Sequence, residues 1–319
     1  MPNRAVRLVV GVVAVAMALI TGTPSASAEE PNDPDATTSV AARTGLDVSW
    51  PQCGDVLPSE MSYAIIGVNG GTAASTNPCL AEQLTWAFDT TTGADPEQPR
   101  VQLYVNTANP GQVLEEYQVT TWPTDNLDSR GTDSSARPDV THRNPYGSCA
   151  ITPRAYNGYT NDLACSWQYG WNRAVESVDQ RFAPAARAAG VSAAAADYRW
   201  WLDVETMNSW QRNGAEAFRR NTAALEGMTQ FYRSEGVTEV GLYSTHYQWY
   251  RIVGDTLTGT DGAGHTTGSN LRGALTWLAG AVDATSAQAR CSTLTGLTGG
   301  PVVLYQYIAD DLDHNYSCG

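Results

Sequence analysis

Two carboxylates lie two positions apart in the stretch Arg-Trp-Trp-Leu-Asp-Val-Glu, residues 199–205. This stretch is predicted to be a β-strand, in which alternate side chains point to opposite faces. Asp203 and Glu205 would then share one face, roughly 6.5 to 7 Å apart along the strand. Acids at this spacing can cleave a glycosidic bond, one by protonating the leaving oxygen and the other by stabilising positive charge on the sugar. A strand end with two solvated acids would show the same pattern, so the rest of the chain must separate the two interpretations.

Polar side chains recur where the other predicted strands end. They are Asp47, Ser49, Asn69, Asn106, Asn109, Tyr243, Ser244, Gln306, Asp310, Asp311 and Asp313. In a β/α barrel the active site lies at the carboxyl ends of the strands, where these residues would meet. Each one alone is more often a loop residue or a helix cap, but their recurrence at one end favours a site.

Short apolar runs alternate with helical segments, which is typical of an α/β protein with a largely parallel sheet. The predicted strands are 46–50, 63–69, 101–107, 199–205, 240–245, 275–281 and 302–308. The predicted helices are 78–88, 171–189, 215–234 and 247–253. At least five strand-to-helix steps favour a closed barrel, with an open doubly wound sheet as the alternative.

The first 28 residues have the features of a secretory signal peptide. Arg4 and Arg7 precede an apolar run over 8–20, and Ala-Ser-Ala at 26–28 precedes Glu29. Residues 29–44 are rich in Pro, Asp, Thr and Ala, which predicts a disordered lead before a single domain over 45–319. No later segment reaches the roughly 20 apolar residues of a membrane helix. We therefore expect a secreted, extracellular protein that does not associate with membranes.

Charge and motifs exclude several classes of partner and cofactor. The net charge is −14 and the sequence contains no lysine, which disfavours binding to nucleic acids and anionic membranes. The four histidines lie far apart, and no phosphate-binding, dinucleotide-binding or zinc-protease motif is present. The sequence thus predicts no metal and no cofactor, and we expect a monomer.

Six cysteines in an exported chain predict three disulfides, for which fifteen pairings are possible. We favour joining neighbours in the sequence. The favoured pairs are Cys53 with Cys79, Cys149 with Cys165, and Cys291 with Cys318. A catalytic or zinc-binding thiol is the alternative, but the sequence contains no Cys-x-x-Cys motif.

The segment 120–165 is long, polar and punctuated by Gly, Pro and Asn, and such loops are usually functional or disordered. Aromatic residues lie in it or just after it: Tyr146, Tyr156, Tyr159, Trp167, Tyr169 and Trp171. Aromatic faces stack well on sugar rings, so these residues could form the wall of a glycan groove. Covering the barrel rim is an equally good interpretation.

Four pieces of sequence together resemble the glycoside hydrolase family 25 lysozymes, the muramidases of the Chalaropsis type. The pieces are Gly-Leu-Asp-Val-Ser at 45–49, Trp-Leu-Asp-Val-Glu at 201–205, Gly-Leu-Tyr-Ser at 241–244, and Tyr-Gln-Tyr at 305–307 followed by Asp-His-Asn at 313–315. Their order and approximate spacing match across nearly the whole mature domain. The resemblance implies an irregular TIM-like (β/α) barrel of the (β/α)5β3 kind that cleaves the β-1,4 bond between N-acetylmuramic acid and N-acetylglucosamine.

The resemblance also implies roles for individual residues. Glu205 would be the general acid, Asp203 its charged partner, and Asp47 and Asp313 the remaining acids of the cleft. Asp203 would either attack the sugar directly or orient the substrate's own acetamido group. The residues expected to contact the substrate are Asn69, Tyr104, Asn106, Trp201, Tyr243, Gln306 and Tyr307. Neighbouring carboxylates, together with Trp200, Trp201 and Tyr243, are expected to raise the pKa of Glu205.

Two segments depart from the family pattern. The third strand has Tyr-Val-Asn-Thr at 104–107 in place of a Tyr-His-Phe-like motif, and the second ends in Val-Asn-Gly-Gly at 68–71. These changes alter the walls of the cleft and spare the four acids.

The leading hypothesis is a secreted hydrolase of peptidoglycan or a chitin-like glycan. A glycan-binding or wall-associated domain without turnover is the second, and a disulfide-stapled interaction protein with no sugar ligand is the third.

Overall fold

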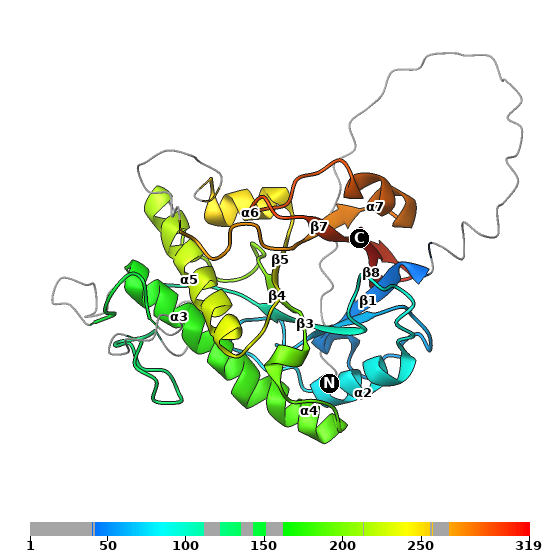
Figure 1. The fold of residues 1–319 in the computed structure, drawn as a ribbon, viewed down its shortest axis with the longest axis horizontal. Coiled ribbons are helices and arrows are strands. Elements are labelled where there is room, and N and C mark those ends of the chain that lie inside the picture. Colours follow the sequence, from blue (N-terminus) through cyan, green and yellow to red (C-terminus); the bar gives the residue numbers. More distant parts are fainter. Residues whose placement is uncertain are drawn as a thin grey trace, which may run out of the picture.

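The computed structural model describes residues 40, 42–111, 122–134, 143–150, 162–212, 214–255, 257 and 268–319. Eight strands close into a barrel in sequence order, as labelled in Figure 1. They are β1 (Thr44–Val48), β2 (Ala64–Gly67), β3 (Val101–Asn106), β4 (Trp200–Asp203), β5 (Val240–Ser244), β6 (Thr276–Ala281), β7 (Val302–Ala309) and β8 (Leu312–Ser317). Strands β1 to β7 pair in parallel, and β8 is antiparallel to both β7 and β1. The closed barrel predicted from the sequence is confirmed, and the open sheet is excluded.

Helices follow five of the strands, from β2 to β6. They are α2 (Leu80–Thr90), α3 (Leu163–Glu176) continued by the π-helical η4 (Ser177–Phe182) and α4 (Ala183–Ala189), α5 (Ala215–Ser234), α6 (His246–Val253) and α7 (Ala284–Cys291). The short 3-10 helix η1 (Trp50–Gln52) follows β1, and a second one, η5 (Ala195–Asp197), precedes β4. In the described part of the chain, β1, β7 and β8 have no α-helix of their own after them. Five β/α units and three further strands make up the expected (β/α)5β3 arrangement. Helix α7 was not predicted from the sequence.

Helices α3 and α5 lie side by side along one flank of the barrel (Figure 1). A Cβ atom on Gly170 would lie 1.8 Å from the carbonyl oxygen of Ala224, so the two backbones are in direct contact. Trp167, Tyr169 and Trp171 are all fully buried, Trp167 and Trp171 in the main core and Tyr169 against Trp122. The interpretation of these three residues as the wall of a glycan groove is therefore wrong.

These aromatic residues are buried because helix α3 begins earlier than the sequence suggested. The carboxylate of Asp162 accepts a hydrogen bond from the backbone nitrogen of Cys165 and caps α3, which begins at Leu163, eight residues before the predicted start at 171. Tyr146 lies partly buried and bonds to Glu226 of α5. The remaining two aromatic residues, Tyr156 and Tyr159, lie outside the described residues.

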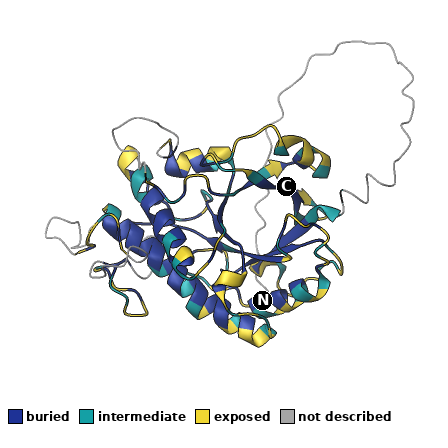
Figure 2. Ribbon diagram, in the orientation of Figure 1, coloured by how far each residue is buried: buried dark blue, intermediate teal, exposed yellow. Residues whose placement is uncertain are grey.

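The strands separate two apolar cores. Leu202 and Val204 pack outward against the helices, whereas Trp201 fills the barrel interior with Ile65 and Trp277. Figure 2 shows the buried strands and the buried sides of the surrounding helices. The predicted alternation is confirmed over β4, because Asp203 shares the interior face with Trp201. The strand is shorter than the predicted 199–205, and Glu205 lies two residues beyond its end. The aromatic interior forms a dry floor beneath the open end of the barrel.

The hairpin from β7 to β8 was not predicted from the sequence. Asp310 and Asp311 form its two-residue turn, with φ values of 51° and 61°. Asp tolerates this left-handed conformation, and two such residues make the type of turn that fits the twist of a hairpin. The residues after them were not among the predicted strands but form β8, because a strand with polar side chains facing a barrel interior lacks the apolar signal of the other strands.

Three disulfides join Cys53 to Cys79, Cys149 to Cys165, and Cys291 to Cys318. These are the pairs favoured from the sequence. The Cα atoms of the three pairs are 5.7, 4.6 and 5.3 Å apart, within the usual range for a disulfide. No cysteine of the described chain is free.

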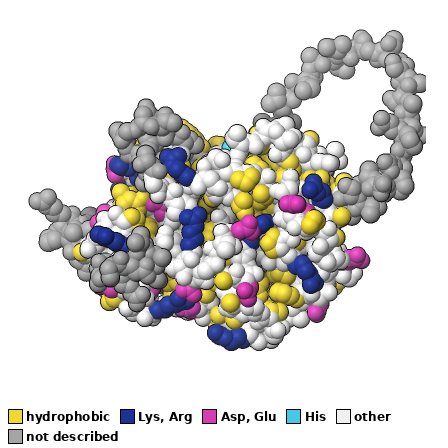
Figure 3. Space-filling model, viewed as in Figure 1, with side chains coloured by type: hydrophobic (Ala, Val, Ile, Leu, Met, Phe, Trp, Pro, Cys, Tyr) yellow, Lys and Arg dark blue, Asp and Glu magenta, His cyan; other side chains and the backbone are white. Residues whose placement is uncertain are grey.

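Acidic and basic side chains are interspersed on the face shown in Figure 3, with apolar side chains between them. Within the described ranges, no helix is both long and apolar enough to cross a membrane. The signal peptide at 1–28 lies outside the described residues, and β1 already begins at Thr44, the last residue of the expected lead. Secretion, the monomeric state and the absence of nucleic-acid and membrane partners stay predictions.

Candidate active site

Four carboxylates meet at the open end of the barrel, where the parallel strands end. Asp47 on β1 pairs in register with Asp313 on β8, and Asp203 ends β4 two residues before Glu205. Asp47 and Asp203 are buried, with 7% and 4% of their surfaces exposed, while Glu205 and Asp313 are half-buried. The structure thus brings together all four acids that the family resemblance implied.

Asp47 is held by two amide side chains. Asn315 on β8 donates from Nδ2 to Oδ2 of Asp47 at 2.7 Å, and Gln306 on β7 donates from Nε2 to the same oxygen at 3.0 Å. Gln306 in turn accepts a hydrogen bond from the hydroxyl of Tyr243 at 2.7 Å. This chain of hydrogen bonds fixes one orientation of the Asp47 carboxylate. Asn315 belongs to the resemblance motif but was not predicted as a site residue.

Asp203 is held from β3. Asn106 donates from Nδ2 to Oδ2 of Asp203 at 2.5 Å, and its backbone nitrogen donates to Oδ1 of Asn69 at 3.0 Å. Asn69 is 1% exposed and its Nδ2 points to the carbonyl oxygens of the loop that follows β2. Asn69 therefore positions Asn106 and is too buried to contact a substrate. The other carboxylate oxygen of Asp203, Oδ1, is buried and has no hydrogen-bond partner among the described residues.

Glu205 receives a hydrogen bond from Gln248, a residue that sequence reasoning missed. Gln248 Nε2 donates to Oε1 of Glu205 at 3.3 Å, and Gln248 Oε1 accepts from the backbone nitrogen of Thr206 at 2.6 Å. No signal in the sequence indicated this contact, because Thr245-x-x-Gln248 has the spacing of a capping box, in which the Gln side chain would bond to the backbone of Thr245. Thr245 does cap α6, accepting from the backbone nitrogen of Gln248. The Gln248 side chain turns toward Glu205.

Burial raises the pKa of each of the four acids. For Asp47 the negative charge of Asp313 adds to this effect, and the hydrogen bonds from Gln306 and Asn315 oppose it. For Asp203 the charge of Glu205 adds to burial, and the bond from Asn106 opposes it. Burial is also the main cause for Glu205, opposed by the hydrogen bond from Gln248. The acids are thus close enough to disfavour one another's ionisation, which adds to the effect of burial on their pKa values.

The aromatic residues expected at the site divide by strand face. Trp201 is fully buried in the floor, where its Nε1 donates to Oε1 of Gln102 at 2.8 Å, so it desolvates the site from below without reaching a substrate. Trp200 points outward and stacks on Tyr232, so the expectation that it desolvates Glu205 is wrong. Tyr104 and Tyr243 are partly buried in the interior core. They remain the aromatic candidates for substrate contact.

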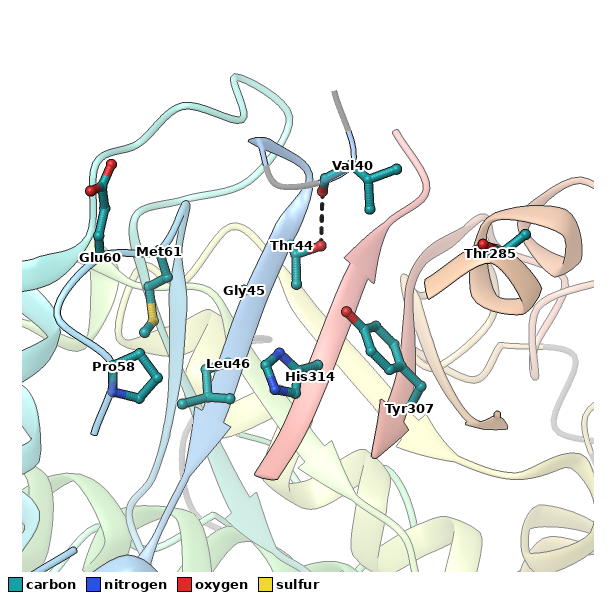
Figure 4. Close-up of a pocket in the computed structure, with 10 residues that line it drawn as sticks. All are labelled: Val40, Thr44, Gly45, Leu46, Pro58, Glu60, Met61, Thr285, Tyr307 and His314. Carbon is teal, nitrogen blue, oxygen red and sulfur yellow. Dashed lines mark hydrogen bonds between the residues drawn. The ribbon is translucent and has the colours of Figure 1, made fainter. Parts of the chain in front are cut away.

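Tyr307 does not reach the acids. It follows Gln306 on β7 and therefore points to the outer face, where its ring stacks on His314 with centroids 5.4 Å apart. Both side chains line a cavity of about 610 Å³ on the outer wall between β1, β7 and the start of α7 (Figure 4). Tyr307 was expected to contact the substrate beside the four acids, but it lines this separate pocket.

Across the described residues, no group of three or more His, Cys, Asp and Glu side chains is arranged to hold a metal ion. No protein-family model matches the sequence, and no curated protein matches it.

Several solved structures are similar to this chain. A family 25 glycosyl hydrolase from Bacillus anthracis is 13% identical with a TM-score of 0.43, over 86% of this chain and 88% of that one. A bacterial lysozyme from Streptomyces coelicolor is 14% identical with a TM-score of 0.41, over 86% and 92%. A muramidase from Trichobolus zukalii is 13% identical with a TM-score of 0.41, over 86% and 93%.

Proposed function

We propose that this protein is a glycoside hydrolase, and specifically a muramidase that cleaves the β-1,4 bond between N-acetylmuramic acid and N-acetylglucosamine. One observation carries the hydrolase proposal: a half-buried glutamate lies beside three further acids at the carboxyl ends of the barrel strands. The choice of glycan rests on the resemblance of the motifs at 45–49, 201–205, 241–244 and 305–315 to family 25 lysozymes.

Glu205 is the general acid in this proposal. A general acid must carry a proton at the working pH and still reach the glycosidic oxygen. Burial raises the pKa of Glu205, which favours the protonated form, and its side chain is only half-buried. The hydrogen bond from Gln248 Nε2 holds one carboxyl oxygen, Oε1, and leaves the other available to protonate the leaving group.

Asp203 serves as the charged partner below Glu205. It is 4% exposed, and one of its oxygens is occupied by Asn106. A carboxylate this deep is better placed to orient and stabilise the substrate's acetamido group than to attack the sugar directly. In that scheme the acetamido oxygen displaces the leaving group, and water then opens the cyclic intermediate while Glu205 takes back a proton.

Asp47 and Asp313 complete the cluster from the neighbouring strands. The charge of Asp313 adds to the raised pKa of both Asp47 and Glu205. We assign these two acids to keeping Glu205 protonated and to binding substrate hydroxyl groups. Binding alone does not require four clustered carboxylates, whose mutual repulsion costs stability, so turnover is favoured over a binding-only domain.

The test uses the mature protein and its Glu205→Gln variant, each incubated with peptidoglycan and, separately, with chitin. Products are followed by reducing-end assay and mass spectrometry. The wild type is expected to release fragments with reducing muramic acid ends, and the variant to release none while keeping its fold by circular dichroism. Activity retained in the variant would remove Glu205 from the mechanism. Cleavage of chitin alone would keep the mechanism and change the substrate, and binding without cleavage of either polymer would favour the binding domain.

A further inference from the structure

A second pocket, lined by both polar and apolar side chains, lies next to the loop that follows Glu205 at the same end of the barrel. Its volume is about 440 Å³, and its walls come from the loop after Glu205 and from helix α6. Thr206 in its lining donates to Gln248 Oε1, and Gln248 donates to Glu205. Trp210, also in the lining, donates from Nε1 to the backbone oxygen of Glu205 at 2.8 Å. The pocket is therefore attached to the proposed general acid through two separate sets of hydrogen bonds.

The pocket has the opposite charge to the site beside it. Arg212 and Arg251 both line it and both are exposed. Among the described residues, no carboxylate is part of its lining, and neither arginine forms an ion pair. In a chain of net charge −14, two guanidinium groups that pair with no described carboxylate favour the binding of an anion. Arginine suits a carboxylate, because its planar group can form two parallel hydrogen bonds to one.

Aromatic side chains accompany the arginines. Tyr247 and Tyr250 on α6 line the pocket and remain 69% and 64% exposed. Large aromatic groups left in water beside a cleft usually mark a binding surface. Aromatic faces beside cations suit a ligand that combines sugar or peptide surface with a negative charge.

We propose that this pocket binds a carboxylate-bearing substituent of the glycan strand, so that the protein prefers an acidic, peptide-substituted glycan to a neutral one. The inference rests on the proposed hydrolase function and deepens it, because it names the part of the substrate that the pocket recognises. Arg212 and Arg251 act here in binding and take no part in the chemistry at Glu205.

The test compares the wild type with Arg212→Gln, Arg251→Gln and the double variant on three soluble substrates. These are glycan strands that carry their peptides, the same strands with every carboxyl group converted to a methylamide, and strands whose peptides have been removed so that only the lactyl carboxylate remains. Arg187→Gln on α4 is the matched control, since it removes an exposed arginine at the opposite end of the barrel. Binding is also measured by calorimetry in the Glu205→Gln background, where no turnover is needed.

For the double variant we expect KM on peptide-bearing strands to rise about tenfold with kcat nearly unchanged, a size that fits two partly exposed ion pairs. The wild type should show a similar loss on methylamide strands, and the variants should lose nothing further there. A loss on peptide-bearing strands alone assigns the pocket to peptide carboxylates, whereas an equal loss on stripped strands assigns it to the lactyl group.

Failure of this inference and failure of the proposed function give different results. If the wild type cleaves peptidoglycan and the arginine variants match Arg187→Gln on every substrate, the pocket assignment is overturned and the hydrolase stands. If nothing is cleaved but binding of acidic strands depends on the two arginines, the hydrolase proposal fails and the pocket assignment stands. Neither cleavage nor arginine-dependent binding would overturn both.

Discussion

Gln248 Nε2 lies 3.3 Å from Oε1 of Glu205 and donates a hydrogen bond to it, although the two residues come from different β/α units. The amide of Gln248 is fixed at its other end by Thr206, which donates to Gln248 Oε1 from both its backbone nitrogen and its hydroxyl. A neutral donor held in this way stabilises the carboxylate form of Glu205 and opposes the effect of burial on its pKa. Gln248 thus helps to set the pH at which Glu205 carries its proton.

The variant Gln248→Ala should move the activity profile toward higher pH. Loss of the donor raises the pKa of Glu205, so the basic limb of kcat/KM, where the acid loses its proton, shifts upward. Loss of one neutral hydrogen bond should lower kcat about two- to tenfold. Gln248→Glu keeps an acceptor for Thr206 but adds a negative charge, and should shift the limb further. Profiles that coincide with the wild type would remove Gln248 from the site.

Asn106→Ala should lower kcat without weakening substrate binding to the same extent. Asn106 is the donor to Oδ2 of Asp203, and without it the pKa of Asp203 rises further, so less of the charged form is present. A hydrogen bond to a charged group corresponds to about a ten- to hundredfold loss. Thr107→Val is the control, because it removes a hydrogen bond to the backbone oxygen of Asp203 and leaves the carboxylate untouched. Equal losses in the two variants would indicate a purely structural effect.

Asp47→Asn should stabilise the protein at neutral pH. Burial raises the pKa of Asp47 above its ordinary value of 3.8, so between the two values the native state binds more protons than the unfolded state. Stability therefore falls as pH rises through that window, and the full cost is present above the folded-state pKa. Asparagine can keep the hydrogen bonds from Gln306 and Asn315 on its oxygen.

Thermal unfolding of Asp47→Asn tests the predicted direction of the change in stability. The variant should melt above the wild type at pH 7, by about 2–4 °C for each kcal/mol gained in a domain of this size, and the two should converge below about pH 4. Asp55→Asn, which replaces an exposed aspartate outside the acid cluster, is the control. A variant that melts lower than the wild type at pH 7 and stays lower at acidic pH would contradict the proposed cost of the acid cluster.

Gly241→Ala should destabilise the barrel by about 1–3 kcal/mol, the usual cost of overpacking. A Cβ atom on Gly241 would lie 2.2 Å from Cζ3 of Trp201, on the floor below the acids. Phenylalanine at 201 lacks the outer ring that causes the clash, so the double variant Gly241→Ala/Trp201→Phe should be less destabilised than the sum of the single changes. Denaturant unfolding of the four proteins gives the coupling, and strict additivity would show that the clash is relieved elsewhere.

The sequence by itself determined the properties that depend on local geometry. The period of a strand placed Asp203 and Glu205 on one face and Leu202 and Val204 on the other. Alternation of strands and helices predicted a closed barrel, and short separations along the chain favoured the three disulfides. Each of these follows from residues near one another in the chain, so no knowledge of the distant partners was needed.

Only the tertiary structure decided what distant segments do together. It turned Asp310 and Asp311 into a hairpin, so that Asp313 arrives on an antiparallel strand opposite Asp47. The same pleat sent Tyr307 to the outer wall and Gln306 to the acids, and it brought Gln248 across from α6 to Glu205. Barrel closure sets which residues of separate strands meet, and the pKa of each acid depends on the burial and neighbours that closure creates. Neither is encoded in the spacing of residues along a single strand.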